Sequence, residues 1–368
     1  MNLREPKKKI VWQAHEANQS GANIALLEYV FCLQDVYDFH IILPHIGNMT
    51  AILKERKISF SVIHQNNWAQ KFVWWDLINF FRISLRSYLA IRQIKKLLIR
   101  EKSDIVFTNT QVPFTAAVAA NRLNIPHVWW IHEFGEEDFG FKIGWGNQKW
   151  AYKKMQQWSQ LIVYNSFAVA NKFKLYIPSV KFCSIYQPVT WHGNIYCEKK
   201  IAKFLIFGQI TPSKGQKEVL LAMAANKKNN LPSNRLHIKG PCENQTYLEE
   251  LNQIIRDNNL QESVQIETGF FNKAEIMPMY EVLIVPSRSE AFGRVIVEAN
   301  KAGLKVLVKN CGGAPELVNE TNGLLYNTED ELKSILSGQK ELIEGPCCLN
   351  YSESEEIEKI KDILNKIS

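Results

Sequence analysis

The sequence predicts an α/β protein made of two doubly wound domains. Short apolar runs recur along the chain, and they are continuous rather than alternating, which is typical of strands buried on both faces of a parallel sheet. A helical pattern follows most of these runs, as in a series of strand–helix–strand units. The series restarts after residues 189–200, and 368 residues exceed what one core usually holds. We therefore expect an N-terminal domain over 1–195, a second domain over 196–345 and a closing segment over 346–368.

The predicted strands occur at similar intervals in both halves. In the first half they cover 9–13, 39–43, 60–63, 104–109, 127–132 and 161–165. In the second half they cover 203–208, 235–240, 264–269, 282–287 and 305–310. Helical patterns lie between them, for example at 22–34, 216–227 and 247–259. The C-terminal stretch SESEEIEKIKDILNKIS has acids early and lysines late, as a helix dipole favours, so we expect a helix that packs back toward the N-terminal domain.

The composition is that of a soluble globular protein. Hydrophobic residues make up 46% and charged residues 22% of the chain. We find no uninterrupted apolar run of about eighteen residues, and the basic N-terminus MNLREPKKKIVWQ lacks the apolar core of a signal peptide. The seven cysteines are scattered and never spaced C-x-x-C, which disfavours a disulfide framework and a zinc site. We expect a cytoplasmic protein.

Positive charge is concentrated in the first half. Residues 1–197 carry 23 Lys and Arg against 13 Asp and Glu (+10), and residues 198–368 carry 21 against 24 (−3), which sums to +7. All ten tryptophans also lie at or before Trp191. This half suggests an anionic membrane surface or a phosphorylated ligand as partner, and a solvated basic face explains it equally well. No DNA or RNA motif accompanies the charge, so we do not expect a nucleic-acid partner.

One basic segment, 76–102, allows two interpretations. It is apolar on most sides, with cations interleaved at Arg82, Arg86, Arg92, Lys95, Lys96 and Arg100. It is either a pair of core helices with basic edges or a helix that lies on a membrane interface, and we favour the first.

Candidate ligand-binding residues lie where predicted strands turn into helices, because open parallel sheets bind ligands beyond the carboxyl ends of their strands. Gly21 precedes a helix after the first strand, and His132 ends the strand at 127–132. Gly208 begins a turn that ends with Lys214 and Gly215 at a helix start. Backbone N–H groups and a cation at such a start suit phosphate oxygens.

A second turn of this kind lies between two glutamates, Glu290 and Glu298. Phe292, Gly293 and Arg294 occupy the start of the helix that carries Glu298. A carboxylate is a poor neighbour for phosphate but a good acceptor for pairs of hydroxyls. The pattern therefore indicates one ligand with two hydroxyl-rich ends, a sugar and a ribose joined by a diphosphate.

Other ligand classes fit the sequence less well. It contains no G-x-x-x-x-G-K-[ST] pattern, and no G-x-G-x-x-G follows the first strand, which disfavours a P-loop and an ordinary dinucleotide site. The acids at 136–138 resemble a metal motif only superficially, because no apolar strand directly precedes them. We expect no metal and no cofactor. His132 taken alone would more often be a buried, satisfied histidine.

The motifs HE, GQITPSKG, TGF, VPSRSEAFGRVIVEA, GGAPELV and NGLLY, in this order, resemble the group 1 glycosyltransferases, a retaining family with the GT-B fold. The resemblance is clear from about 204 to 326 and weaker around Gly21 and His132. Its most specific part is the E-x7-E element in its P-S-x-x-E-x-F-G context, followed by G-G-x-P-E. It implies two Rossmann-like domains that face each other across a cleft.

The resemblance also implies roles for individual residues. Glu290 would hold hydroxyls of the donor sugar, Glu298 the ribose hydroxyls and Lys214 the diphosphate. His132 would lie beside the reacting sugar and, with Glu290 and Lys214, would form the catalytic set. The other donor-binding candidates are Gly21, Gly208, Gln209, Phe270 near the base, Ala291, Phe292, Gly293 and Arg294.

One position departs from the family pattern. Many members have arginine directly after the glycine, where this chain has Gln209. The diphosphate would lack a bidentate cation there, so either Arg294 or Arg288 compensates or donor binding is weaker.

The implied reaction moves a hexose-type sugar from a UDP- or GDP-sugar to a hydroxyl of a glycan or lipid-linked acceptor, in cell-surface polysaccharide synthesis at the inner face of the membrane. It proceeds with retention and without metal, because Lys214 and helix N-termini would stabilise the leaving diphosphate. Three alternatives remain: a non-catalytic relative that binds nucleotide sugar or a partner protein, which Gln209 favours, a nucleic-acid binder, and a sugar-nucleotide epimerase.

Overall fold

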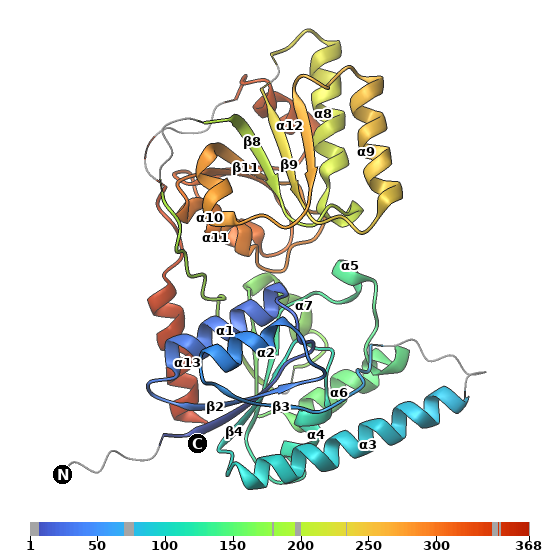
Figure 1. Ribbon diagram of the computed structural model, residues 1–368, viewed down its shortest axis with the longest axis vertical. Helices are drawn as coiled ribbons and strands as arrows, with labels where there is room; N and C mark the ends of the chain where they lie inside the picture. The colour runs from blue at the N-terminus through green and yellow to red at the C-terminus, as the bar shows by residue number, and fades with distance from the viewer. Residues whose placement is uncertain are drawn as a thin grey trace, which may run out of the picture. The chain divides into compact units, whose positions relative to one another are not determined.

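The computed structural model describes residues 7–69, 77–178, 180–195, 200–232, 234–340, 345 and 347–367. The chain divides into two compact units (Figure 1). The first is Met1–Pro188 with Glu353–Ser368, and the second is Val189–Ser352. The two units are described separately below.

The first unit is built on a parallel sheet whose seven described strands have the order β3-β2-β1-β4-β5-β6-β7. The central strands are buried on both faces, which explains their continuous apolar sequences. The strands are β1 (Lys9–Gln13), β2 (Asp38–Leu43), β3 (Ser59–Val62), β4 (Ile105–Asn109), β5 (His127–Ile131), β6 (Leu161–Tyr164) and β7 (Lys181–Ser184).

Helices connect these strands. They are α1 (Gly21–Leu33), α2 (Asn48–Glu55), α3 (Leu77–Arg100), α4 (Thr115–Asn121), α5 (Glu136–Phe139), α6 (Gln148–Trp158) and α7 (Phe167–Lys174), with the short 3-10 helix η1 (Gly144–Gly146). The last helix of the chain, α13 (Glu353–Lys366), also belongs to this unit. Its Ile360 and Leu364 are buried in the core that α1 and the sheet form, and Glu356 accepts a hydrogen bond from the backbone N–H of Tyr186 at 2.8 Å.

Several tryptophans form the interior of the first unit rather than a ligand-facing surface. Trp12 and Trp130 stack with ring centroids 5.5 Å apart, and Trp68 and Trp129 stack at 5.7 Å. All four are at most 2% exposed. Much of the aromatic content that the sequence concentrates in this half is therefore explained by core packing.

The second unit is built on a smaller parallel sheet of six described strands, in the order β10-β9-β8-β11-β12-β13. They are β8 (Ala202–Phe207), β9 (Leu236–Gly240), β10 (Val264–Thr268), β11 (Tyr280–Val285), β12 (Lys305–Lys309) and β13 (Gly323–Tyr326). The helices are α8 (Gln216–Lys228), α9 (Gln245–Asp257), α10 (Lys273–Ile276), α11 (Arg294–Lys301) and α12 (Glu329–Leu336), with the 3-10 helices η2 (Pro212–Lys214), η3 (Met277–Met279) and η4 (Ala314–Leu317). Leu236, Ile238 and Leu307 are among its fully buried core residues.

Every strand predicted from the sequence is present, with ends within two residues of those expected. Two further strands, β7 and β13, were not predicted. Both lie at the edge of their sheets, and both are only four residues long. The expected helix pair in 76–102 was wrong, because residues 77–100 form one continuous helix, and residue 76 lies outside the described residues.

The unit boundaries also differ from those expected at 195 and 346. Val189 belongs to the second unit, where its carbonyl accepts from Lys301 Nζ at 2.5 Å and its N–H donates to the Tyr351 hydroxyl at 3.0 Å. The Cys348 carbonyl accepts from Asn319 Nδ2 at 2.8 Å, so the segment before α13 is likewise part of the second unit.

Each sheet has a point where the strand order reverses. In the first sheet it lies between β1 and β4, and in the second between β8 and β11. Loops that leave two such neighbouring strands run to opposite faces of the sheet, which opens a crevice at the strands' carboxyl ends. These two positions are therefore the first places to look for ligand-binding side chains.

Candidate functional site

In the second unit, the turn after β8 and the turn after β11 meet at the reversal point. Arg288 N–H donates to the carbonyl of Ser213 at 2.9 Å, which joins the two turns directly. Gly215 allows this close approach, since a Cβ at this position would be 1.9 Å from the carbonyl oxygen of Pro286. Its φ of +73° also lies in the left-handed region that favours glycine.

This contact brings Lys214 and Glu290 together. Lys214 ends η2, and its Nζ donates to Oε2 of Glu290 at 2.9 Å. The Glu290 side chain is 16% exposed and the Lys214 side chain 39%. The backbone carbonyl of Glu290 also accepts from the N–H of Gly313 at 2.7 Å, so the loop after β12 fixes the glutamate from a third direction.

Glu298 lies in the second turn of α11 and is held by a second lysine. Nζ of Lys273 donates to both carboxylate oxygens, at 2.9 and 2.7 Å. Arg294, at the first position of α11, has Nη2 4.0 Å from Oε1 of Glu298. The Glu298 side chain is only 8% exposed, so its charge depends on these cations for compensation.

The remaining candidates surround these two pairs. Gly293 caps α11 with a φ of +98°, and Ala291 and Phe292 before it are buried. Gly208 follows β8, and its carbonyl oxygen lies 1.9 Å from where a Cβ of Gly240 would be, so two backbones touch here. Phe270, after β10, is 94% exposed.

Gln209 is exposed, and its backbone carbonyl accepts from Nε2 of Gln216 at 3.0 Å. The backbone of Gln209 is therefore tied to the first residue of α8.

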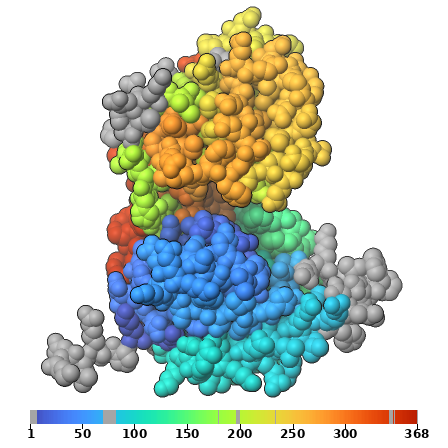
Figure 2. All heavy atoms as spheres, in the orientation of Figure 1, coloured from blue at the N-terminus to red at the C-terminus, as the bar shows by residue number. Residues whose placement is uncertain are grey.

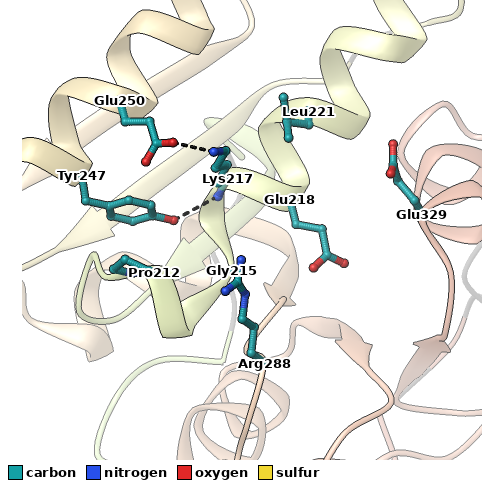
Figure 3. Close-up of a pocket in the computed structure, with 9 residues that line it drawn as sticks. All are labelled: Pro212, Gly215, Lys217, Glu218, Leu221, Tyr247, Glu250, Arg288 and Glu329. Carbon is teal, nitrogen blue, oxygen red and sulfur yellow. Dashed lines mark hydrogen bonds and ion pairs between the residues drawn. The ribbon is translucent and has the colours of Figure 1, made fainter. Parts of the chain in front are cut away.

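A pocket of about 310 Å³ lies next to the η2 turn, between the starts of α8, α9 and α12 (Figure 3). Lys217 lines it, paired with Glu250 at 2.5 Å, and Arg288 projects into it. Neither Glu290 nor Glu298 lines this pocket. Two arginines were expected to compensate for Gln209. Arg294 lies beside Glu298, whereas Arg288 lines this pocket, which neither glutamate reaches.

In the first unit, the reversal point carries a chain of buried amide and imidazole groups. Asn23, in the first turn of α1, donates to the carbonyls of Glu16 and Asn18 at 3.1 and 2.8 Å and so fixes the loop that precedes Gly21. Asn109, the last residue of β4, donates to the carbonyl of Ala22 at 3.1 Å. Gly21 is the first residue of α1 and is exposed.

His132 continues this chain of contacts. Its Nε2 lies 2.8 Å from Oδ1 of Asn109, and its Nδ1 lies 2.7 Å from Nε2 of Gln187. The amide of Gln187 donates, so Nδ1 accepts and the proton resides on Nε2, which donates to Asn109. The ring is 8% exposed and stacks on Trp130 with a centroid distance of 5.5 Å. Both nitrogens of the His132 ring are thus engaged by side-chain amides of the same unit.

Glu133 is a buried carboxyl group next to this histidine. Its two oxygens accept from the backbone N–H groups of Gln111 and His132, at 2.7 and 3.0 Å. Burial raises the pKa of Glu133 to about 7, and the two backbone donors offset only part of this effect. The side chain bridges the ends of β4 and β5.

The acids at 136–138 are used locally. Glu136 pairs with Lys142 at 3.0 Å, Glu137 pairs with Lys172 at 2.9 Å, and Asp138 accepts from the N–H of Phe134 at 2.6 Å. Over the described ranges, no group of three or more His, Cys, Asp or Glu side chains is arranged to hold a metal ion.

Sequence reasoning missed three residues that contact the candidates. Lys273 follows the exposed Phe270 by three positions, and only the fold brings it to Glu298. Asn109 and Gln187 hold the two nitrogens of His132 from distant parts of the chain. The available signal was Asn109 itself, a polar residue that ends a buried strand at the reversal point.

Two family descriptions match the chain in succession. "Glycosyltransferase Family 4" matches residues 67–189, and "Glycosyl transferases group 1" matches residues 194–357. A curated relative, an "Uncharacterized 41.2 kDa protein in cps region" of Klebsiella pneumoniae, is 41% identical over 56 residues. That match spans 15% of this chain and 16% of the relative's length.

Solved structures share the architecture at low sequence identity. HepE of Anabaena in complex with UDP superposes with a TM-score of 0.72 at 19% identity, over 98% of this chain and 100% of that one. HepE in complex with UDP-glucose gives 0.71, over 97% and 99%. The lipopolysaccharide outer core galactosyltransferase WaaB gives 0.66 at 15% identity, over 96% and 94%.

These likenesses and the two parallel-sheet units identify the fold as GT-B. The family matches, which take in most of both units, show that the chain belongs to the group 1 glycosyltransferases.

Proposed function

We propose that this glycosyltransferase moves a hexose-type sugar from a UDP-sugar to a hydroxyl of a glycan or lipid-linked acceptor, with retention and without a metal ion. The observation that carries the proposal is the pair of lysine–glutamate contacts, Lys214–Glu290 and Lys273–Glu298, on either side of the N-terminus of α11. Two carboxylates suit two hydroxyl-rich groups, and the helix N-terminus between them suits the diphosphate that joins these groups.

Each carboxylate would bind one end of the donor. Glu290 would accept hydrogen bonds from the sugar hydroxyls and Glu298 from the ribose hydroxyls. A carboxylate has about four lone-pair sites, so Glu298 can keep its contact with Lys273 while it accepts two hydroxyls. Phe270, which is 94% exposed after β10, offers a flat apolar surface for the base. UDP is favoured over GDP because the structural relative HepE was solved with UDP and with UDP-glucose.

The proposed mechanism relies on electrostatic stabilisation of the leaving group. The bond between the anomeric carbon and the diphosphate oxygen breaks, and Lys214, Arg294 and the N-terminus of α11 stabilise the negative charge that develops. The acceptor oxygen forms its bond on the face that the diphosphate leaves, which retains the configuration. The acceptor's proton passes to the departing diphosphate, since both nitrogens of His132 are already hydrogen-bonded. The role of His132 would then be to position the loop after β5.

The acceptor proposal rests on charge and on one relative. The basic first half of the chain suits a phosphorylated, lipid-linked saccharide. The short match to a protein from a cps region supports a role in polysaccharide synthesis.

Calorimetric titration of UDP, GDP and ADP into the wild type and into Glu298→Ala tests the donor site. We expect UDP to bind and the variant to lose most of the affinity. Saturation with UDP at a hundredfold excess over its dissociation constant should raise the free energy of unfolding by about 2.7 kcal/mol. If no nucleotide binds to the wild type, the proposed donor site is wrong.

Turnover distinguishes an enzyme from a binding protein. With a panel of UDP-hexoses, Glu290→Ala should abolish hydrolysis and transfer, and addition of a chelator should leave the wild-type rate unchanged. Binding of UDP without any turnover would favour the non-catalytic alternative that Gln209 suggests. Activity that disappears with the chelator would refute the metal-independent mechanism.

A further inference from the structure

The longest helix of the first unit, α3, combines strong positive charge with a complete lack of acidic residues. Its 24 residues include six Arg and Lys and no Asp or Glu. At 1.5 Å per residue the helix is about 36 Å long. It lies along one side of the first unit, and its atoms form part of that unit's surface (cyan in Figures 1 and 2).

One face of α3 packs into the unit. The buried side chains are Ser87, Ala90, Ile91, Ile94, Leu97 and Leu98, which recur every three or four positions and therefore share one face. α4 is the helix that α3 contacts most. This face accounts for the folding role of the helix.

The outer face of α3 mixes cations with large apolar side chains. Leu85 is 59% exposed, Tyr88 49%, Leu89 46% and Ile99 62%. The cations exposed with them are Arg82, Arg86, Arg92, Lys96 and Arg100. The guanidinium of Arg92 lies over the ring of Tyr88 at 5.9 Å. Only Arg100 among these cations has an ion-pair partner within the described residues, Glu101 at 2.8 Å.

We propose that this outer face of α3 docks on an anionic lipid bilayer, with the helix axis parallel to the membrane plane. Leucine, tyrosine and isoleucine side chains can enter the boundary between headgroups and acyl chains, while arginine and lysine extend to the lipid phosphates. This proposal goes beyond the transferase activity and does not depend on it.

The mixed character of the face selects this partner over others. A nucleic acid would use the cations but would leave the exposed Leu85, Leu89 and Ile99 without a matching surface. A second copy of the same face would bring like charges together. No helix in the described part of the chain has the length and apolar character to cross a bilayer, so α3 would lie on the surface rather than insert across it.

Co-sedimentation with lipid vesicles tests the proposal. The purified full-length chain is mixed with vesicles of phosphatidylcholine alone and with vesicles that also contain phosphatidylglycerol. We expect binding to the mixed vesicles only, and weaker binding as salt is raised. The charge variant Arg86→Gln/Arg92→Gln/Lys96→Gln should lower the partition coefficient on the order of a hundredfold, since each removed cation contributes separately.

A matched control removes the same charge elsewhere in the first unit. Lys54, Lys174 and Lys181 are exposed and lie outside α3, so their replacement by Gln should change binding much less. A second variant, Leu85→Ser/Leu89→Ser, keeps the charge and should weaken the binding that persists at high salt. Circular dichroism and thermal unfolding establish that each variant folds like the wild type, as exposed positions should allow.

Three outcomes would overturn the proposal. Equal binding by the α3 charge variant and the lysine control would show that total charge, not this face, is responsible. Equal binding of the wild type to neutral and anionic vesicles would remove the electrostatic basis. A dimer in sedimentation velocity that only the α3 variants abolish would assign the face to a second copy of the chain. None of these results bears on donor binding, which the nucleotide titration measures without lipid.

Discussion

Replacing Gly215 by alanine should separate the two turns on which the candidate donor site depends. The added Cβ would be 1.9 Å from the carbonyl oxygen of Pro286 and 2.8 Å from its carbonyl carbon. Both are backbone atoms, so no side chain can rotate away to relieve the contact. Ordinary van der Waals contact requires about 3.5 Å, so the turns must move apart by roughly 1.5 Å.

The cost has three parts. Alanine at a φ of +73° is strained by roughly 1–2 kcal/mol. A shift of this size would break the 2.9 Å hydrogen bond from Arg288 N–H to Ser213, which contributes about 1 kcal/mol. Disturbed packing between the turns adds a similar amount, so we expect a loss of about 3–4 kcal/mol in the free energy of unfolding. The same shift would pull Lys214 away from Glu290 and weaken UDP binding.

Gly338 provides a matched control in the same unit. Its φ is +80°, and a Cβ there would meet nothing within 4 Å. Gly338→Ala therefore has the same backbone strain without the collision and should lower the free energy of unfolding by only about 1–2 kcal/mol. Urea unfolding followed by circular dichroism measures both variants, and calorimetry measures UDP binding. If Gly215→Ala matches Gly338→Ala in stability and binds UDP like the wild type, the close approach at Pro286 does not organise the site.

Further expectations concern single side chains. Lys214→Met should weaken binding progressively more from uridine to UMP to UDP, because Lys214 is proposed to bind the diphosphate. Lys273→Met should weaken the binding of all three ligands by the same factor, because Lys273 acts through Glu298, which is proposed to bind the ribose that they share. Calorimetry with the three ligands measures both variants, and the reverse pattern would exchange the roles of the two lysines. Phe270→Ala should leave stability unchanged and raise the dissociation constant for UDP about tenfold, by loss of stacking. Burial raises the pKa of Glu133 to about 7, so between pH 4.5 and 7 the folded state keeps a proton that the unfolded state has lost. Stability should therefore fall by up to about 3 kcal/mol as pH rises through this window, and urea unfolding at several pH values should show a flatter profile for Glu133→Gln.

Most of the strands that the sequence predicted are buried on both faces, although the more exposed edge strands β3 and β10 were predicted as well. Strands such as β4 and β5 are buried at every position and mostly apolar because helices cover both sides of the sheet, and that composition is visible without any tertiary information. β7 and β13 lie at sheet edges, where one side has no neighbouring strand and the sequence need not be uniformly apolar. Their pairing is a tertiary property that local patterns do not record.

The candidate site divides in the same way. Glu290, Gly293 and Glu298 belong to one continuous strand-to-helix segment, so their spacing alone makes them candidates. The partner of Glu298 comes from the start of α10, and the partners of His132 come from the end of β4 and from the segment that follows β7. These contacts depend on strand order, which the sequence analysis did not assign. His132 and Lys214 could therefore be proposed as candidates from the sequence, but their hydrogen-bond partners could not.

The two lysines explain how the proposed donor site would keep two carboxylates ready for hydroxyls. A carboxylate as buried as that of Glu298 is costly without a partner, and water cannot fully hydrate it. Lys273 supplies the partner in the ligand-free protein, and Lys214 does the same for Glu290. Both lysine side chains are more than a third exposed, so they can move when hydroxyls or phosphate oxygens arrive, while the glutamates, on a rigid turn and a helix, stay in place. In this proposal the separation of eight residues has a physical reason: it puts the N-terminus of α11 between the two acids, where an anionic group that joins two hydroxyl-rich groups would be stabilised.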